Sequence, residues 1–332
     1  MPTPKLEDVA RHAGVSKTTV SRVLNNRGYL SQKTIDNVNL AISELGYHPN
    51  IVARQLLKTK TNLIGILLPT ISDPFFGELA SLLEKKLYKK GYKVIIGNST
   101  NDASKEIDYL NQLLSKQVDG LIVGTHNQNI AEYRQQNLPI VAIDRIINDD
   151  IPIIESDNYK GGVLATERLI DQGAKNIVHT NVSQKESPMQ KRRLGYESVM
   201  EANNLDGKTY IIDFDIPITK KLDLLDQIFE ENPNIDAIFA GNDTDAAFAM
   251  QVAQTRGLSI PNDLLIIGYD GTELIRNVLP QLTTIIQPLD NMTDLAVDIL
   301  EARMSGKQTK KEYIHPITIW EGTTDKPDYN LN

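Results

Sequence analysis

Residues 6–25 read LEDVARHAGVSKTTVSRVLN, and this stretch decides the fold of the N-terminal part of the chain. Its apolar residues recur at helical spacing on both sides of Gly14. Gly14 can adopt the positive φ that ends a helix, and Ser16 is placed to cap the next one. The spacing therefore predicts two short helices, over 6–13 and 17–24, joined by a turn of about three residues, which is a helix-turn-helix.

The second of these helices has the chemistry of a major-groove reader. Its outward positions carry short hydroxyls, one amide, Lys17 and Arg22. An arginine can bind guanine O6 and N7 together, and hydroxyls reach phosphates or base edges. Any one of these residues could instead belong to an ordinary polar helix face, but the pattern of the whole segment favours DNA.

A third helix and a hinge are predicted to follow. Ser31 is placed to cap an amphipathic helix that Gly46 ends, and Pro49 prevents its continuation. Asn50 can then cap the seven residues 51–57, which are too few to form a stable helix alone. We expect this hinge to be disordered off DNA and to fold when it docks. The alternative is that its leucines simply pack on the rest of the chain.

Composition and charge support a small DNA-binding head on a larger globular body. Of 332 residues, 40% are hydrophobic and 23% charged, as in chains that fold into two or three domains. Residues 1–60 hold nine Lys/Arg and four Asp/Glu, a net charge of +5, whereas residues 61–332 hold 26 and 39, a net charge of −13. This asymmetry is expected when only the head meets phosphates, although chance variation could also produce it.

Several classes of protein are disfavoured by what the sequence lacks. The chain has no cysteine, so it has no disulfide and no thiolate site. Its N-terminus is acidic where a signal peptide would be apolar, and its apolar runs are far shorter than the ~20 residues of a membrane span. No phosphate-binding glycine loop, nucleophile elbow or metal-type histidine spacing is present. We therefore expect a cytoplasmic protein that is not an enzyme, with no catalytic residue, cofactor, metal or membrane partner.

The remainder of the chain alternates short apolar strands with amphipathic helices. This alternation predicts parallel sheets covered by helices on both faces, and right-handed crossovers make such sheets doubly wound. The pattern restarts near residue 160, so we expect two subdomains. The predicted organisation is a head over 1–48, a hinge over 49–60 and an α/β body over 61–332, whose subdomains comprise about 61–160 plus 289–320 and about 161–288 plus 321–332.

Polar side chains recur where the predicted strands end. Ligands of doubly wound sheets bind outside the carboxyl ends of the strands. Carboxylates and amides bond to sugar hydroxyls, arginines donate two bonds at once, and aromatic rings cover the apolar face of a sugar. Loop and capping roles are the alternative for each residue alone. The candidate effector-binding residues are Asp73, Phe75, Phe76, Asp144, Arg145, Asp157, Arg192, Phe214, Asn242, Asp270 and Gln287.

The run DVARHAGVSKTTVSRVLNNRGYLSQKT, followed by LGYHPNIVARQLLKTKTNLIGILLP, resembles the LacI/GalR family of bacterial repressors. The resemblance extends over the whole chain and implies a body that is similar to periplasmic sugar-binding proteins. Within the family, the phrases NNRGYLSQKT, VDGLIVGTHN, ESDNYKGG and IIGYDGTELI look most like sucrose operon repressors of Gram-positive bacteria.

The family resemblance implies how the head meets DNA. Two hinge helices of a homodimer would pair in the minor groove, where Leu56 would wedge between base pairs and Ala53 would allow close approach. The tail after Trp320 has no leucine heptads, so a dimer is expected rather than a coiled-coil tetramer. The implied DNA-binding residues are Ser16, Lys17, Thr18, Thr19, Ser21, Arg22, Asn25, Tyr29, Ser31, Asn50, Ala53 and Leu56.

The resemblance also implies a sugar site in the body and a mechanism. Most of the candidate effector residues match the family's sugar-site segments, but Asp73 stands where relatives often carry Asn, which leaves the exact sugar open. Whether that sugar is phosphorylated also stays open. A sugar bound between the subdomains would close them, unpair the hinge helices and lower operator affinity. Two alternatives remain: a ribose-responsive repressor, and a global catabolite regulator that needs a phosphocarrier protein. A plain sugar-binding protein is a further rival that the basic head disfavours.

Overall fold

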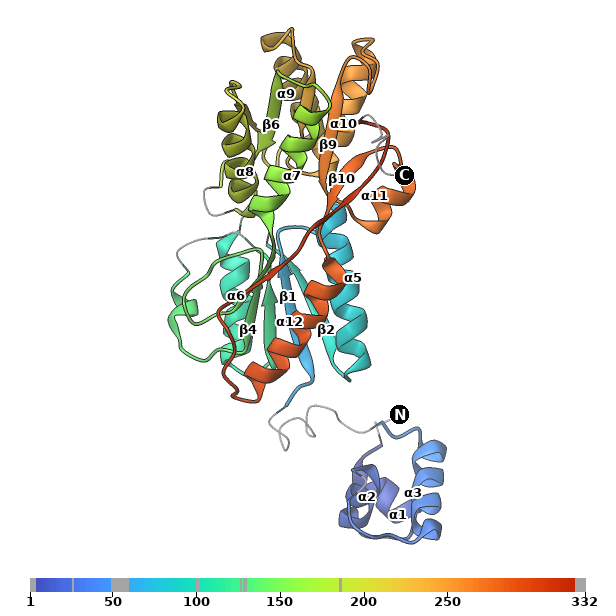
Figure 1. Ribbon diagram of the computed structural model, residues 1–332. Coiled ribbons are helices and arrows are strands. Elements are labelled where there is room, and N and C mark those ends of the chain that lie inside the picture. The colour runs from blue at the N-terminus through green and yellow to red at the C-terminus, as the bar shows by residue number, and fades with distance from the viewer. Residues whose placement is uncertain are drawn as a thin grey trace, which may run out of the picture. The chain divides into compact units, whose positions relative to one another are not determined.

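The computed structural model describes residues 4–25, 27–48, 60–99, 102–125, 127, 130–184 and 187–325. The chain forms two compact units, and the division between them falls in the sequence between residues 61 and 62. The first unit is the helical head and the second is the α/β body (Figure 1). The boundary lies within one residue of the expected start of the body.

The head has three helices: α1 (Leu6–His12), α2 (Lys17–Leu24) and α3 (Gln32–Leu45). Ser16 Oγ accepts a hydrogen bond from the amide of Thr19 at 3.1 Å, so Ser16 caps α2 as its position predicts. Gly14 and Gly46 adopt the positive φ angles, +67° and +58°, that end α1 and α3. The fully buried side chains at the centre of the head are Val9, Val20 and Val38.

The first lobe of the body is built on a six-stranded sheet in the order β11-β5-β4-β3-β1-β2, in which every pairing is parallel. The strands are β1 (Leu63–Leu68), β2 (Lys93–Asn98), β3 (Gly120–Val123), β4 (Ile140–Ile143), β5 (Ile153–Ser156) and β11 (Glu312–His315). The helices of this lobe are α5 (Pro74–Lys89), α6 (Ala103–Leu114), the 3-10 helix η1 (Ala131–Arg134) and α12 (Leu289–Met304).

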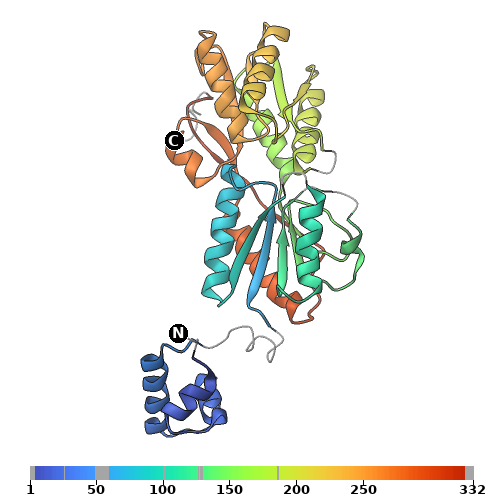
Figure 2. The same cartoon turned by 180° about the vertical axis from the view of Figure 1, so that it is seen from behind.

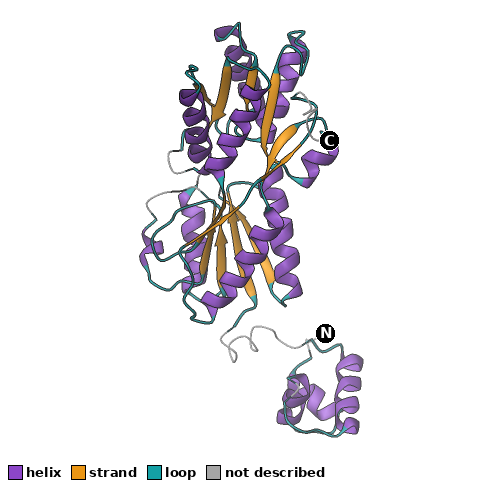
Figure 3. Cartoon of the chain, in the orientation of Figure 1, coloured by secondary structure: helices purple, strands orange, loops and turns teal. Residues whose placement is uncertain are grey.

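The second lobe repeats this plan with the order β12-β10-β9-β8-β6-β7. Its strands are β6 (Ile177–Asn181), β7 (Lys208–Ile211), β8 (Ala237–Phe239), β9 (Leu265–Asp270), β10 (Thr283–Ile286) and β12 (Thr318–Trp320). Its helices are α7 (Asn158–Asp171), α8 (Pro188–Ala202), α9 (Ile218–Glu231), α10 (Asp243–Thr255) and α11 (Glu273–Val278). Figure 3 shows the two sheets, one in each lobe, with helices around both.

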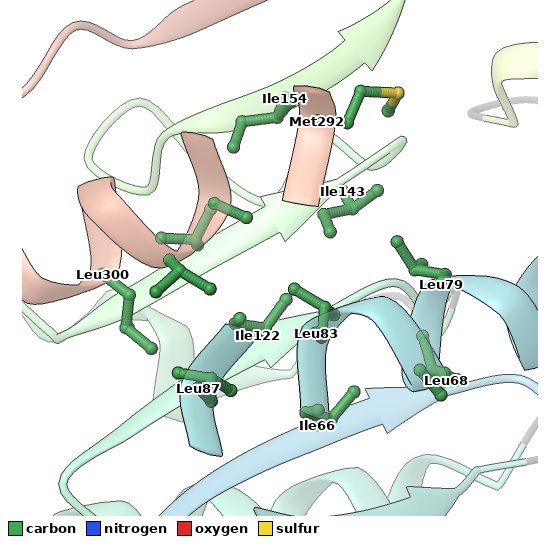
Figure 4. Packing of buried hydrophobic residues seen from close by; sticks show 14 of the residues in the cluster. Ile66, Leu68, Leu79, Leu83, Leu87, Ile122, Ile143, Ile154, Met292 and Leu300 are labelled. Carbon is green, nitrogen blue, oxygen red and sulfur yellow. The ribbon is translucent and has the colours of Figure 1, made fainter. Parts of the chain in front are cut away.

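Each sheet is covered on both faces, as the doubly wound pattern predicts. In the first lobe, α5 and α12 pack on one face and α6 packs on the other, which is turned to the viewer in Figure 2. Leu79, Leu83 and Leu87 of α5 follow the helical period and point into the core against Ile66 and Leu68 of β1 (Figure 4). In the second lobe, α9 and α10 cover one face and α7 and α8 the other.

The chain passes between the lobes three times within the described part of the body, after β5, after β10 and after β11. The third passage differs from the expected subdomain boundary at about residue 320. Strand β12 pairs antiparallel with β10, so residues 318–320 belong to the second lobe. The alternation of apolar residues could not reveal this exchange, because strand periodicity carries no information about pairing partners. Among the described residues, no helix has the length and apolarity needed to cross a membrane.

Candidate functional site

The candidate DNA-binding face of the head lies on α2 and the loop that follows it. Most of these predicted side chains are exposed, and Tyr29 is 93% exposed. Thr19 and Asn25 are partly buried and bond locally: Thr19 Oγ1 lies 2.9 Å from Ser16 Oγ, and Asn25 Nδ2 donates to the carbonyl of Ser21 at 2.7 Å. The exposed members are Ser16, Lys17, Thr18, Ser21, Arg22, Tyr29 and Ser31.

The two cations of α2 are held by neighbours in the DNA-free chain. Lys17 forms an ion pair with Glu7 of α1. Arg22 donates through Nε to the carbonyl of Arg27 at 3.3 Å and through Nη2 to the carbonyl of Tyr29 at 3.4 Å. The ion pair of Lys17 and the hydrogen bonds of Arg22 are exposed to water and therefore weak. Both side chains can exchange these partners for phosphates or base edges.

Residues 49–59 of the expected hinge lie outside the described residues. This applies to Asn50, Ala53 and Leu56, the three predicted DNA-binding residues within it. Their roles in the minor groove stay predictions.

In the body, a small cavity of about 30 Å³ between the two lobes brings together predicted effector residues from seven separate segments of the chain. Asp73 caps α5 at the cavity wall, where its Oδ1 accepts from the amide of Phe75 at 2.9 Å. Asp144 follows β4, Asp270 ends β9 and Gln287 follows β10, as expected for a site at the carboxyl ends of strands. The predicted residues in its lining are Asp73, Phe75, Phe76, Asp144, Arg192, Phe214, Asn242, Asp270 and Gln287.

Aromatic side chains from both lobes form one wall of this cavity. Phe75 and Phe76 meet edge to face, with ring centroids 5.1 Å apart and an interplanar angle of 79°. Phe76 of the first lobe also meets Phe214 of the second, at 6.4 Å and 73°. Such rings can offer apolar faces to C–H groups, and the carboxylates of the same lining can accept hydrogen bonds from hydroxyl groups.

Arg192 is fixed in the cavity by contacts on all sides. Its Nε donates to Asn158 Oδ1 at 2.8 Å, and its Nη1 donates to the carbonyl of Gly241 at 2.6 Å. Nη1 also lies 3.6 Å from Asp270 Oδ1, and the guanidinium carbon lies 3.6 Å from the centroid of the Tyr269 ring. Only 3% of Arg192 is exposed, so its charge is oriented before any ligand arrives.

The carboxylates of the cavity are desolvated. Burial raises the pKa of Asp144 to about 7, although the nearby Arg192 opposes this rise. Burial also raises the pKa of Asp73 and of Asp270. Asp144 Oδ1 is buried and has no hydrogen-bond partner among the described residues. A buried polar atom without a partner costs free energy, so Asp144 offers an unused bond to a ligand hydroxyl.

Two predicted effector residues lie elsewhere. Arg145 is buried on the other side of its strand end, where it pairs with Glu106 and donates to Thr125 Oγ1 at 2.7 Å. It lines neither of the cavities described here. Asp157 caps α7, accepting from the amide of Lys160 at 3.1 Å, and is likewise absent from both linings. The alternative of a structural role at a loop or a helix cap therefore fits both residues.

The start of α8 also contributes residues that sequence reasoning missed. Ser187, Pro188 and Met189 line the small cavity next to Arg192. Ser187 Oγ accepts from the amide of Met189 at 3.3 Å, and Pro188 occupies the first helical turn. A serine followed by proline is a readable helix start. It could have shown that Arg192 lies one turn into α8, near a helix terminus that lines the small cavity.

A second, larger cavity of about 510 Å³ adjoins the first and shares Asp73 and Phe214 with it. Its lining comes from the turn before α5 in the first lobe and from several segments of the second lobe. The remaining lining residues are Pro69, Thr70, Ser72, Pro74, Ser183, Gln184, Asp213, Asp215, Ile216, Ile218, Lys221, Thr244 and Phe248. Within the described parts of the chain, no group of three or more His, Asp or Glu side chains is arranged to hold a metal ion.

Comparisons with known proteins agree with both units. Residues 5–50 match the model of bacterial regulatory proteins of the lacI family, and residues 61–325 match that of periplasmic binding proteins and the sugar binding domain of the LacI family. The sucrose operon repressor of Pediococcus pentosaceus is 45% identical over 97% of this chain and 99% of its own length. The ribose operon repressor of Halalkalibacterium halodurans is 40% identical over 91% of each chain. The structure of the Lac repressor dimer bound to operator and the anti-inducer ONPF is similar with a TM-score of 0.83, at 25% identity over 97% of this chain and 99% of that one.

Proposed function

The chain belongs to the LacI family of bacterial regulatory proteins, and on that premise we propose that it is a sugar-responsive transcriptional repressor of sucrose utilisation genes. As a homodimer in the cytoplasm it would bind a pseudo-palindromic operator, with one head on each half-site. A sugar bound between the lobes of the body would release it. We assign it no catalytic step, cofactor or metal.

The observation that carries this proposal is that one chain contains both a candidate DNA-binding head and a candidate sugar-binding cavity. A helix-turn-helix head with an exposed Lys17 and Arg22 precedes a two-lobed body whose cavity is lined by carboxylates, one arginine and phenylalanines. The near full-length match to a protein named sucrose operon repressor supports the regulated genes. The Lac repressor, similar over nearly the whole chain, supports the dimer and the operator, since its structure holds both.

The lobes give the mechanism its physical basis. The small cavity lies between them, and contacts such as the 2.7 Å bond from Ser156 Oγ to Gln287 Oε1 link the first lobe to the second. A sugar that bonds to Asp144 from one lobe and Arg192 from the other would favour a closed arrangement. The sugar shifts the population only by its difference in affinity for the two arrangements, typically about 1–3 kcal/mol of coupling.

Fluorescence anisotropy on labelled operator DNA tests the proposal. The purified protein would be titrated, at fixed salt, onto DNA from upstream of its own and neighbouring genes, and then sucrose, sucrose 6-phosphate, fructose and ribose would be added in turn. We expect tight, sequence-specific binding that one sugar releases. The absence of specific binding, or tight binding that every sugar leaves unchanged, would contradict the repressor or its sugar control respectively.

Ribose control is the second candidate function. The small cavity has the residue types of a pentose site, and a ribose operon repressor shares 40% identity with the chain. Release by ribose alone would favour it. A phosphocarrier-dependent regulator is the third reading, which would be favoured if operator binding required an added phosphorylated carrier protein.

A further inference from the structure

We propose that Ser156 and Asn158 are positioning residues that tie the small cavity to the passages between the lobes. This inference rests on the proposed sugar control and names residues through which that control would act. Neither side chain lines the small cavity or the larger one. Ser156 ends β5 and Asn158 begins α7, so both lie where the chain first passes between the lobes.

Five buried residues form a closed ring of polar contacts at this point. Ser156 Oγ donates to Gln287 Oε1 at 2.7 Å, and Gln287 Nε2 donates to Asp270 Oδ1 at 2.8 Å. Arg192 Nη1 lies 3.6 Å from the same Asp270 oxygen, and Arg192 Nε donates to Asn158 Oδ1 at 2.8 Å. Asn158 Nδ2 closes the ring by donating to the carbonyl of Ser156 at 3.0 Å. Arg192, Asp270 and Gln287 also line the small cavity, so one side of the ring belongs to the cavity and the other to the first passage.

Burial holds the ring in one arrangement. The most exposed of the five residues, Asp270, is 8% exposed. Since an arginine only donates, Asn158 must turn Oδ1 to Arg192, which leaves Nδ2 for the carbonyl of Ser156. A buried donor or acceptor that loses its partner finds no water to replace it. Displacing one member of the ring therefore leaves its neighbours unpaired, which links the positions of all five.

The ring also joins the passages to one another. Ser156 lies at the start of the first passage, and Gln287 lies 131 residues away in the second. The third passage is attached by the backbone, because the amide of Asp157 donates to the carbonyl of His315 at 2.9 Å. Movement of two lobes about a hinge is absorbed by backbone rotation in such connecting segments. Because the three passages are bonded to one another at this point, we expect them to rotate as one hinge.

A ligand in the small cavity would meet groups that the ring already uses. A hydroxyl group that bonds to Gln287, Asp270 or Arg192 either adds a bond to the ring or replaces one. Such a ligand shifts the balance between two lobe arrangements only if it binds one of them more tightly. Ser156 and Asn158 fix the ring to the first passage, so they carry this difference to the hinge without touching the ligand.

Hydrogen-exchange mass spectrometry of the full-length protein, without DNA or sugar, tests the ring. Ser156→Ala cuts the side-chain link between the first two passages and leaves every side chain that lines the cavity in place. We expect exchange to become about fivefold faster both in peptides over 157–161 and in peptides over 286–292, where the amide of Gln287 donates to the carbonyl of Asp270. Acceleration confined to the first passage would overturn the proposal.

Two matched controls separate the ring from the loss of any buried bond. Ser99 is buried, follows β2 and donates to a carbonyl of its own lobe, so Ser99→Ala should leave both passages unchanged. Asn158→Ala is the second test variant and should accelerate exchange in both passages. Asn232→Ala is its control, since Asn232 also accepts from a cation, Lys208 Nζ at 2.7 Å, and donates to a backbone carbonyl. Equal acceleration of the passages by a control and its test variant would contradict the ring.

Operator release distinguishes coupling from a merely structural role. The sugar that releases the wild-type protein, from among sucrose, sucrose 6-phosphate, fructose and ribose, would be titrated into operator complexes of each variant. We expect saturating sugar to weaken operator binding by a factor at least about threefold smaller in Ser156→Ala and Asn158→Ala than in the wild type. Both controls should match the wild type. A test variant that unfolds at lower temperature yet keeps the full factor would show a structural role alone.

The failure of the proposed function has a different signature. In that case no sugar would release the wild-type protein from operator DNA. The exchange measurement uses neither sugar nor operator, so it would still decide whether Ser156 and Asn158 join the cavity to the passages.

Discussion

At the scale of single residues, two aspartates of the small cavity combine a strained backbone with a buried carboxyl group. Asp144 and Asp270 both have positive φ, +51° and +113°, which non-glycine residues rarely adopt. Their carboxyl groups are buried as well, and Asp144 Oδ1 lacks a partner among the described residues. Strain and desolvation of this kind gather where a protein is prepared for a ligand.

The pKa of Asp144 makes stability depend on pH. Because burial raises its pKa to about 7, the folded chain holds this proton more strongly than the unfolded chain. The contribution of this group to stability is therefore full below the unfolded pKa of about 4 and is lost as pH rises through about 7. Asp144→Asn, which tolerates positive φ and cannot ionise, should raise the thermal unfolding midpoint at pH 8 by roughly 2–5 °C. Scanning calorimetry should find a smaller gain at pH 5, and an equal gain at both pH values would contradict the argument.

Arg192 and Arg145 form a matched pair for testing the site. Both are buried and paired with a carboxylate, but only Arg192 lines the cavity. Lysine keeps the charge and loses the planar fork. Arg192→Lys should require about tenfold more sugar for operator release, whereas Arg145→Lys should stay within about twofold, both measured by anisotropy. Equal losses in both variants would contradict the assignment of Arg192, and not Arg145, to the sugar site.

At the scale of elements, capped helix N-termini position residues of the head and of the small cavity. Ser16 and Ser31 cap α2 and α3 in the head, and Asp73 and Ser187 cap α5 and α8 at the cavity. These caps were readable from sequence because a cap depends on contacts within four residues. The segment over 49–59, where a hinge helix is expected, lies outside the described residues.

The cap of α3 provides a test of head stability. Ser31 Oγ accepts from the amide of Thr34 at 3.2 Å. Ser31→Ala should cost about 1 kcal/mol, which corresponds to amide exchange in α3 that is about fivefold faster. Hydrogen-exchange mass spectrometry of the full chain measures it. Ser43→Ala, at an exposed site near the end of the same helix, is the control, and equal acceleration in both variants would deny Ser31 its capping role.

At the scale of the whole body, three chain passages and a few hydrogen bonds connect two lobes, each of which has hydrophobic clusters of its own on both faces of its sheet. Glu78 Oε2 of α5 accepts from the amide of Glu273 at the start of α11, 2.7 Å away, so the lobes also touch beside the cavity. Domains joined in this way commonly close around a ligand as rigid bodies.

Closure can be measured directly because the chain has no cysteine. Ser81→Cys in the first lobe and Lys220→Cys in the second, both at exposed positions, would carry a pair of spin labels. We expect the distance between the labels to shorten by several ångströms when the sugar binds, as measured by pulsed electron resonance. A protein labelled at Ser81 and Lys89, both on α5, should show no change. An unchanged distance across the lobes in the presence of bound sugar would contradict closure.

The sequence by itself determined the features that depend on near neighbours. Helix caps, the turn at Gly14, and the polar residues that follow parallel strands were readable. Most of those polar residues meet in one cavity, because parallel strands of one sheet end at a common edge and residues from that edge of both sheets line the cavity. Only the tertiary structure decided that Asp144 lines the small cavity while Arg145 turns to Glu106, since successive side chains point in opposite directions at a strand end. It also decided that β12 pairs with β10, and that residues as distant in sequence as Ser72 and Phe248 share the larger cavity. These features depend on which lobe a segment packs against, and that is set by long-range contacts that leave no local trace in the sequence.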